Sequence, residues 1–172
     1  MPIVTATQWL LLVLDQMPLP GNGGQLLQAF IAPPNPEEDE LDPHAYIWPS
    51  SGAESRQSVP RAAAPGLGVT QSGWKDELHH VDVFLTWFQD GDHDPNPDIT
   101  YLSVVDAVMA SLRTVADPVL LSDPVTGQLS QISGTGERMN YDIATPKGTD
   151  ADQRLLRYDS RIVVRLMDSF QS

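Results

Sequence analysis

Prolines and glycines interrupt this chain too often for long helices to dominate its fold. Its 172 residues include 15 prolines and 12 glycines. Proline lacks the amide donor that a helix interior needs, and glycine loses more conformational freedom than any other residue when it is ordered. An all-helical bundle is therefore not expected, and the sequence predicts short elements joined by long loops. The length fits a single domain over residues 1–172.

Two segments carry helical patterns. Thr5 and Gln8 have the spacing of a capping box and Pro18 is a stop signal, which together predict a helix over residues 5–17. Residues 100–115 predict a second, amphipathic helix, because their apolar side chains recur every three or four positions. These side chains are Leu102, Val105, Val108, Met109 and Leu112.

Elsewhere apolar and polar side chains alternate, which is the pattern of half-buried strands. The alternation is clearest over residues 80–88, and it returns at 139–143 and 161–166, where we expect a long antiparallel C-terminal β-hairpin. Residues 33–73 are rich in Pro, Ser and Gly and predict an extended loop or arm, in which one short apolar patch at 45–48 is a candidate strand. Shorter strands are expected at 25–32, 119–121 and 128–132. The predicted fold class is α+β, a mainly antiparallel sheet packed by two helices, with long Pro/Gly-rich loops.

The charge balance is strongly acidic. The chain carries 23 Asp and Glu against 10 Lys and Arg, a net charge of −13. The acidic side chains gather in residues 37–100, whereas most arginines lie in the last third of the sequence. Such a surface repels phosphate backbones, so general nucleic-acid binding is disfavoured.

Two features that the sequence lacks exclude further kinds of site and protein. Without cysteine, disulfides, thiolate metal sites and cysteine nucleophiles are excluded. The longest apolar run, from Trp9 to Leu14, is much shorter than the ~20 residues that span a bilayer, and the N-terminus lacks a basic signal-peptide segment. We expect a soluble protein with no membrane contact.

The acidic loop from Asp90 to Asp98 resembles a calcium-binding loop only in part. It offers oxygen ligands at alternating positions, but Pro95 replaces the glycine of the sharp turn and Tyr101 replaces the bidentate glutamate. Asp98 fits better as the N-cap of the following helix. A competing interpretation is a metal-dependent hydrolase, with a site formed by Asp90, Asp92, Asp94 and His93.

The histidines and the possible nucleophile motifs do not predict a metal or catalytic site any more strongly than the acidic loop does. His79 and His80 are adjacent and would point to opposite faces of a strand, while His44 and His93 lie in separate loops. The chain contains neither a Gly-x-Ser-x-Gly turn nor a phosphate-binding loop. Its carboxylates lie in polar runs, where we expect them to be solvated. We therefore expect no catalytic residue, no metal, no cofactor and no enzymatic activity.

Four arginines recur near the end of a chain in which arginine is otherwise scarce. They are Arg154, Arg157, Arg161 and Arg165. One interpretation is strand solubility with local pairing to Asp152 and Asp159. The other is a subunit interface, in which the arginines meet acidic loops of a neighbouring copy. A ring built from one chain needs two different complementary patches, and complementary charge sets their register.

Three stretches, Trp74–Trp87, Val104–Arg113 and Arg161–Met167, resemble parts of the tail-terminator proteins of long-tailed phages that infect actinobacteria. The segment Trp74–Trp87 (WKDELHHVDVFLTW) resembles the central strand of that family, and Val104–Arg113 (VVDAVMASLR) resembles the helix that follows it. The final strand Arg161–Met167 (RIVVRLM) is similar to the strand that closes these proteins.

This resemblance implies a structural virion protein of the tail or neck, assembled in the host cytoplasm. It would form a hexameric ring at the head-proximal end of the tail tube, end tube polymerisation and join the tail to the head connector or stopper protein. Its partners would be its own copies, the tail tube protein and that connector, and DNA would only pass through the lumen. Acidic loops that face the lumen, including Asp90, Asp92 and Asp94, would keep DNA from adhering. The alternatives are a head-completion or stopper neck protein, or a non-viral acidic adaptor whose loop 33–73 captures a partner.

Overall fold

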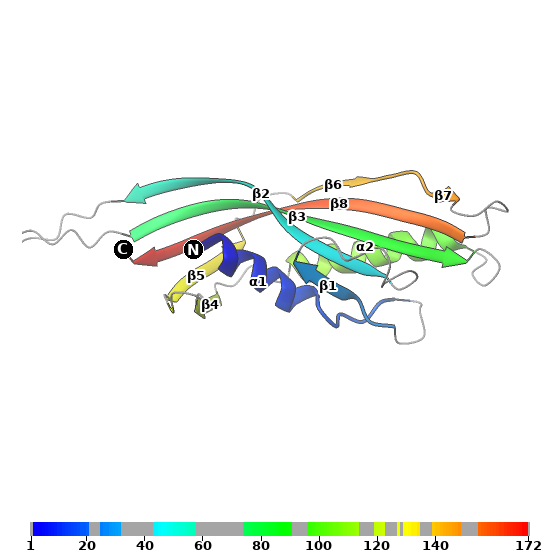
Figure 1. Cartoon of the computed structure of the whole chain (residues 1–172), viewed down its shortest axis with the longest axis horizontal. Helices are drawn as coiled ribbons and strands as arrows, with labels where there is room; N and C mark the ends of the chain where they lie inside the picture. The colour runs from blue at the N-terminus through cyan, green and yellow to red at the C-terminus, as the bar shows by residue number, and fades with distance from the viewer. Residues whose placement is uncertain are drawn as a thin grey trace, which may run out of the picture.

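The fold is organised around one pair of long antiparallel strands. The computed structural model describes residues 2–20, 25–31, 43–57, 74–90, 96–113, 119–122, 127, 129–134, 139–148 and 155–171. Within these ranges a curled sheet carries two helices, so the mixed α+β class is confirmed (Figure 1). The elements are α1 (Pro2–Leu14), β1 (Gln28–Ile31), β2 (His44–Gln57), β3 (Trp74–Asp90), α2 (Pro97–Arg113), β4 (Val119–Ser122), β5 (Leu129–Gly134), β6 (Asn140–Ile143), β7 (Lys147–Gly148) and β8 (Leu155–Gln171).

Strands β3 and β8 pair along their full length of 17 residues, from Trp74 opposite Gln171 to Asp90 opposite Leu155. β2 pairs antiparallel along the other side of β3, with a register shift between Pro49 and Ser51. Because successive residues of a strand point to opposite faces, this ladder sorts the side chains of all three strands into two sets.

The remaining strands flank this three-stranded centre. The sheet order is β1-β2-β3-β8-β5-β4, and β6 and β7 pair with the first half of β8 while β5 pairs with its second half. β6 places Asn140–Ile143 opposite Val163–Ser160 in an antiparallel register. The pairing of β1 with β2 is parallel, which the alternating pattern did not predict.

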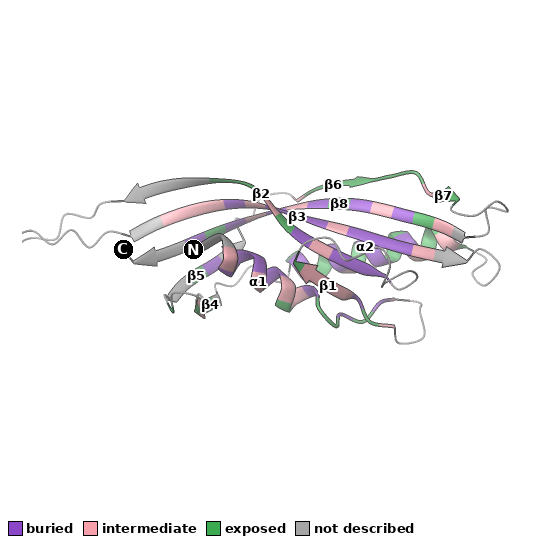
Figure 2. Cartoon of the chain, in the orientation of Figure 1, coloured by how far each residue is buried: buried purple, intermediate pink, exposed green. Residues whose placement is uncertain are grey.

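Both helices pack on one face of the sheet and form the core with it (Figure 2). β3 contributes every second residue, and β8 contributes Ile162, Val164 and Leu166. α2 buries residues three and four positions apart, which is the stripe expected of an amphipathic helix. Full burial of one such side chain stabilises the fold by about 1.5–3 kcal/mol. The buried set of α2 is Tyr101, Val104, Val105, Val108, Met109 and Leu112.

A tyrosine cluster fixes α2 to β8. The Tyr101 hydroxyl donates to Ser160 Oγ at 2.8 Å, and its ring lies 4.7 Å from that of Tyr158. The Tyr158 hydroxyl donates to Asp98 Oδ1 at 2.6 Å, at the first turn of the helix. Burial raises the pKa of Tyr101 above its ordinary value, so the hydroxyl stays protonated and keeps donating.

Both helices begin earlier than the sequence patterns predict. α1 starts at Pro2 rather than residue 5, and α2 starts at Pro97 rather than residue 100. Proline is suited to the first helical position, because its missing amide has no partner there and its fixed φ already matches the helix. α1 ends at Leu14, and Gln16 just beyond adopts a left-handed φ of 62°, the conformation that commonly terminates a helix.

The structure differs from the sequence-based expectation within the predicted arm 33–73. Residues 44–57 of this stretch form β2, which follows β3 over its whole length. The Ser- and Gly-containing half of β2 has low intrinsic strand propensity, so its pairing with β3 accounts for its extended form. The other parts of the predicted arm, 33–42 and 58–73, lie outside the described residues. Within the described ranges, neither helix is long and apolar enough to cross a membrane.

Truncating a core side chain of β3 should destabilise the protein. Leu85 is fully buried, so Leu85→Ala should lower the free energy of unfolding by about 2–5 kcal/mol through lost transfer energy and the residual cavity. Urea denaturation followed by circular dichroism measures this change. Leu120→Ala, at a side chain that is 65% exposed, is the control and should change stability by at most about 0.5 kcal/mol. Equal effects of the two substitutions would contradict the described core.

Candidate functional site

The face of β2, β3 and β8 that points away from the helices is the candidate site. No described element packs over it, and most of its side chains are half-buried or exposed, whereas Asp82 is buried (Figure 2). We call this surface the open face and define it by nine of the outward-pointing residues of the three strands. They are Tyr46 and Trp48 from β2, Asp82, Phe84 and Phe88 from β3, and Arg157, Asp159, Arg161 and Arg165 from β8.

Aromatic rings and arginines alternate across the open face. Tyr46 and Phe84 lie opposite each other in the ladder and stack, with ring centroids 4.5 Å apart and planes inclined by 14°. The Arg161 guanidinium lies 5.9 Å from the Phe84 ring centroid, and that of Arg157 lies 5.7 Å from the Phe88 ring. Burial raises the pKa of Tyr46, so its hydroxyl remains neutral at physiological pH.

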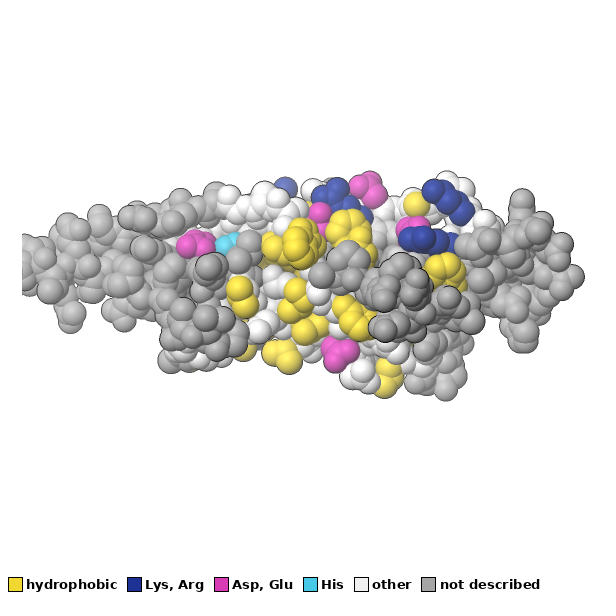
Figure 3. Space-filling view, viewed as in Figure 1, with side chains coloured by type: hydrophobic (Ala, Val, Ile, Leu, Met, Phe, Trp, Pro, Cys, Tyr) yellow, Lys and Arg dark blue, Asp and Glu magenta, His cyan; other side chains and the backbone are white. Residues whose placement is uncertain are grey.

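Trp48 is the most exposed aromatic side chain of this surface. It follows Tyr46 by two positions in β2, so it points to the same face, and it is 51% exposed. Figure 3 shows hydrophobic side chains gathered over the middle of the molecule and Lys and Arg side chains over β6, β7 and the adjoining part of β8. Aromatic residues and arginine together are characteristic of protein interfaces.

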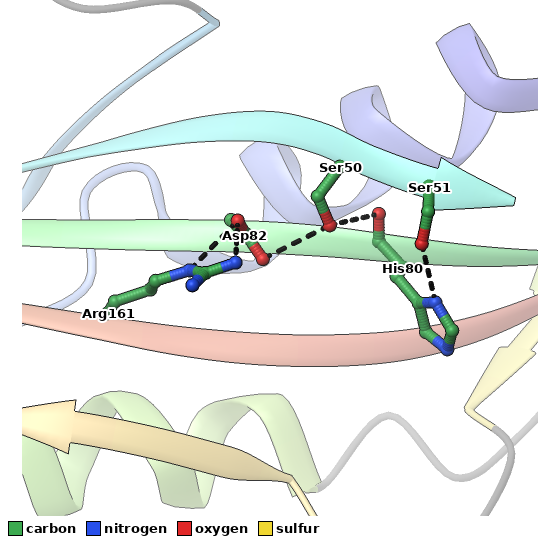
Figure 4. Close-up of polar contacts among 5 residues, drawn as sticks. All are labelled: Ser50, Ser51, His80, Asp82 and Arg161. Carbon is green, nitrogen blue, oxygen red and sulfur yellow. Dashed lines mark hydrogen bonds and ion pairs between the residues drawn. The ribbon is translucent and has the colours of Figure 1, made fainter.

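A buried carboxylate anchors the centre of the open face (Figure 4). Arg161 donates from Nη2 to Asp82 Oδ2 at 2.6 Å and from Nε to the same oxygen at 2.9 Å. Ser50 Oγ donates to Asp82 Oδ1 at 3.2 Å. Asp82 is buried whereas the Arg161 side chain is 46% exposed, so the ion pair neutralises a desolvated charge and leaves the guanidinium edge accessible.

A second ion pair lies nearer the start of β8. Arg157 Nε is 3.1 Å from Asp159 Oδ1, which also accepts a hydrogen bond from Thr86 Oγ1 at 2.9 Å. The sequence suggested that the arginines pair locally with Asp152 and Asp159, and Arg157 does pair with Asp159, whereas Asp152 lies outside the described residues. Arg161 instead pairs with Asp82, 79 positions away in the sequence, which no sequence pattern indicated.

The structure brings together three of the four predicted interface arginines. Arg157, Arg161 and Arg165 are four positions apart in β8, so all three point to the open face. Arg154 lies outside the described residues. Of the predicted lumen-facing acidic loop, Asp90 ends β3, and Asp92 and Asp94 lie outside the described ranges.

The two adjacent histidines lie on opposite faces of β3. His80 points to the outer side, where its Nδ1 is 2.8 Å from Ser51 Oγ. His79 is buried on the core side with its Nε2 3.5 Å from Glu77 Oε2, and burial lowers its pKa. Among the residues that the structure places, no group of three His, Asp or Glu is arranged to hold a metal ion.

Two carboxylates depart from the expectation that all would be solvated. Asp82 and Asp168 are both buried in the sheet. Asp82 alternates with Val81 and Val83 in β3, so the strand pattern places it away from the core, but its burial depends on Arg161 and Ser50 from neighbouring strands. The sequence showed only that Asp82 is an acidic residue within a predicted strand. Its burial could not be inferred without the cross-strand register that brings Arg161 and Ser50 to it.

Comparison with models of known protein families finds no match, and comparison with curated proteins finds none either.

Removing Arg161 should cost more stability than removing Arg157. Arg161→Ala leaves the buried Asp82 carboxylate without its cation, a loss of about 1–3 kcal/mol. Arg157→Ala breaks a pair whose side chains are 47% and 36% exposed, which contributes at most about 1 kcal/mol. Paired urea denaturation curves measure both. A larger loss for Arg157→Ala would argue against the described burial of Asp82.

The burial of His79 predicts a pH-dependent stability. Its pKa is lowered from 6.5 by burial, so the unfolded state binds the proton more strongly than the folded state. This contribution is fully present above the unfolded pKa and is lost as the pH falls below about 6.5. His79→Leu should flatten the decline in unfolding free energy between pH 7 and pH 5, measured by urea denaturation at each pH. Identical slopes for the two proteins would reject the role of His79.

Proposed function

We propose that this chain is a structural virion protein that forms a ring at the head-proximal end of a phage tail tube. There it ends tube polymerisation and joins the tail to the head connector. The observation that carries the proposal is the open face, on which Trp48, Phe84 and Arg161 lie exposed or half-buried with no described element over them. Tyrosine, tryptophan and arginine dominate the binding energy of interfaces, so this composition supports a surface that associates.

Charge supports self-association as the use of this surface. Arg157, Arg161 and Arg165 lie on one face of a chain whose net charge is −13. The internal ion pairs hold two of these guanidinium groups in fixed positions while about half of each side chain stays exposed. A guanidinium group that is already held in place loses little conformational freedom when it binds a carboxylate of a second copy, so such a contact is favoured. Acidic segments of the neighbouring copy would supply that carboxylate.

The remaining parts of the proposal follow from the resemblance to tail-terminator proteins. The partners are other copies of the chain, the tail tube protein and the connector or stopper protein, while DNA passes through the lumen. The acidic residues Asp90, Asp92 and Asp94 would line that lumen. The proposal requires no catalytic residue, metal or cofactor, because the chain would act through contact surfaces alone.

Substitution of Trp48 tests the proposal. Arg161→Glu is a less selective test, because it would place a second carboxylate beside Asp82 and perturb the monomer. Trp48→Ala instead removes the most exposed aromatic side chain of the open face without placing a charge opposite Asp82, and should weaken association by at least about 2 kcal/mol. Size-exclusion chromatography with light scattering should show rings for the wild type and 18.8 kDa monomers for the variant.

Ile99→Ala is the matched control, because Ile99 is 64% exposed at the start of α2, away from the open face. It should leave the rings intact. Both variants should keep the circular dichroism spectrum of the wild type. A wild-type chain that stays monomeric at high concentration, alone and with tail tube protein, would overturn the proposal. Rings that persist in Trp48→Ala would show that the open face is not the contact between subunits.

A further inference from the structure

Strand β6 presents an exposed, partly apolar edge. All four of its residues are exposed, including Tyr141 at 53% and Ile143 at 38%. One side of β6 pairs with β8, and no element within the described ranges pairs with the other. Unpaired edges template association with another strand, and proteins usually protect them with charged residues or proline. In β6 the one charged residue is Asp142, and Tyr141 and Ile143 on either side of it offer no such protection.

The ladder shows which backbone groups of β6 point outward. Ala144 N–H donates to the Asp159 carbonyl oxygen at 2.9 Å, and Ile143 lies opposite Ser160. In an antiparallel pair, residues that exchange hydrogen bonds with the partner alternate with residues whose backbone groups face away. Asn140 and Asp142 therefore bond toward β8, and the N–H and C=O groups of Tyr141 and Ile143 face the free edge.

A second long edge lies on the opposite side of the sheet. β1 pairs with β2 only at His44–Ile47. From Trp48 to Gln57, β2 pairs with β3 on one side, and no strand in the described ranges pairs with its other side. Ser50, Ser51 and Gly52 are small or exposed there, so another backbone has room to approach. Figure 1 shows this part of β2 and the β6–β7 edge toward opposite ends of the long axis.

Strand directions make these two edges compatible between copies. β2 and β8 run in one direction, and β3 and β6 run in the other, because each successive pairing is antiparallel. In a ring whose axis runs along the strands, every copy keeps the same strand directions. β6 of one copy is then antiparallel to β2 of the next copy. The two edges lie at different heights along the strand direction, so neighbouring copies must be offset along that direction for the edges to meet. Closing a sheet into a barrel requires the same kind of offset.

We infer that the subunits join through these edges: residues 140–143 of one copy accept the β2 edge 48–57 of the next copy as an added antiparallel strand. This inference rests on the proposed self-assembly and specifies its contact. The sheet then continues from subunit to subunit, and Tyr141 and Ile143 become buried against the added strand. The contact is heterologous, since two different edges meet, which is the type of interface that generates closed rings.

Cysteine cross-linking tests the pairing, and the chain has no native cysteine to interfere. Asp142→Cys is combined in one chain, in turn, with Ser51→Cys, Ala53→Cys or Ser55→Cys, and treated with a short bismaleimide. One combination should give a ladder of covalent multimers on a denaturing gel. A mixture of the two corresponding single-cysteine proteins should give dimers that contain one of each and nothing larger. Rings that produce neither product with any combination would overturn the inference.

A proline substitution tests the outward donor. Ile143→Pro removes the N–H that faces the free edge and leaves the hydrogen bonds toward β8, so the monomer should keep its thermal stability within a few degrees. Association measured by light scattering should weaken at least about tenfold. Ile143→Ala retains the N–H and should weaken it less.

The outcomes separate this inference from the proposed function. Rings that depend on Trp48 but not on the Ile143 N–H, and that give no cross-links, would reject the edge pairing and leave the proposed function standing. A chain that never assembles, with or without tail tube protein, would reject both.

Discussion

The antiparallel ladder between β3 and β8 determines everything else in this structure. Its register places Val83 and Leu85 beneath the helices and Asp82 and Phe84 on the opposite face. A slip of one residue would exchange the two sets, because side chains alternate strictly along a strand. The core and the open face are therefore two consequences of one alignment, and neither can be changed independently of the other.

The ladder also explains how an acidic residue is kept at the centre of the sheet. Asp82 would be costly to bury alone, but β8 brings Arg161 and β2 brings Ser50 to its two oxygens. Each strand contributes one member of the network. The network in turn restricts the three strands to one relative alignment, since the geometry of the Arg161–Asp82 pair tolerates little displacement.

The sequence predicts those parts of the fold whose signal is local. The alternation over 80–88 and the helical spacing over 100–115 are strong, and β3 and α2 occupy both regions. β2 was recognised only at its apolar start, since the rest depends on β3 for its extended form. For the site, the scarcity of arginine identified three residues of the open face. Tyr46, Asp82 and Phe84 were missed because their neighbours are set by cross-strand register, which a single sequence does not contain.

The wide separation of β3 and β8 in the sequence has a consequence for biosynthesis. During translation β2 and β3 leave the ribosome well before the strand that must lie beside them, and pairing across such a distance is intrinsically slow. Until β8 emerges, Asp82 lacks its cation, and Phe84 and Phe88 lack the guanidinium groups of Arg161 and Arg157. A nascent chain thus lacks the finished open face, and only a chain that has completed its fold presents it.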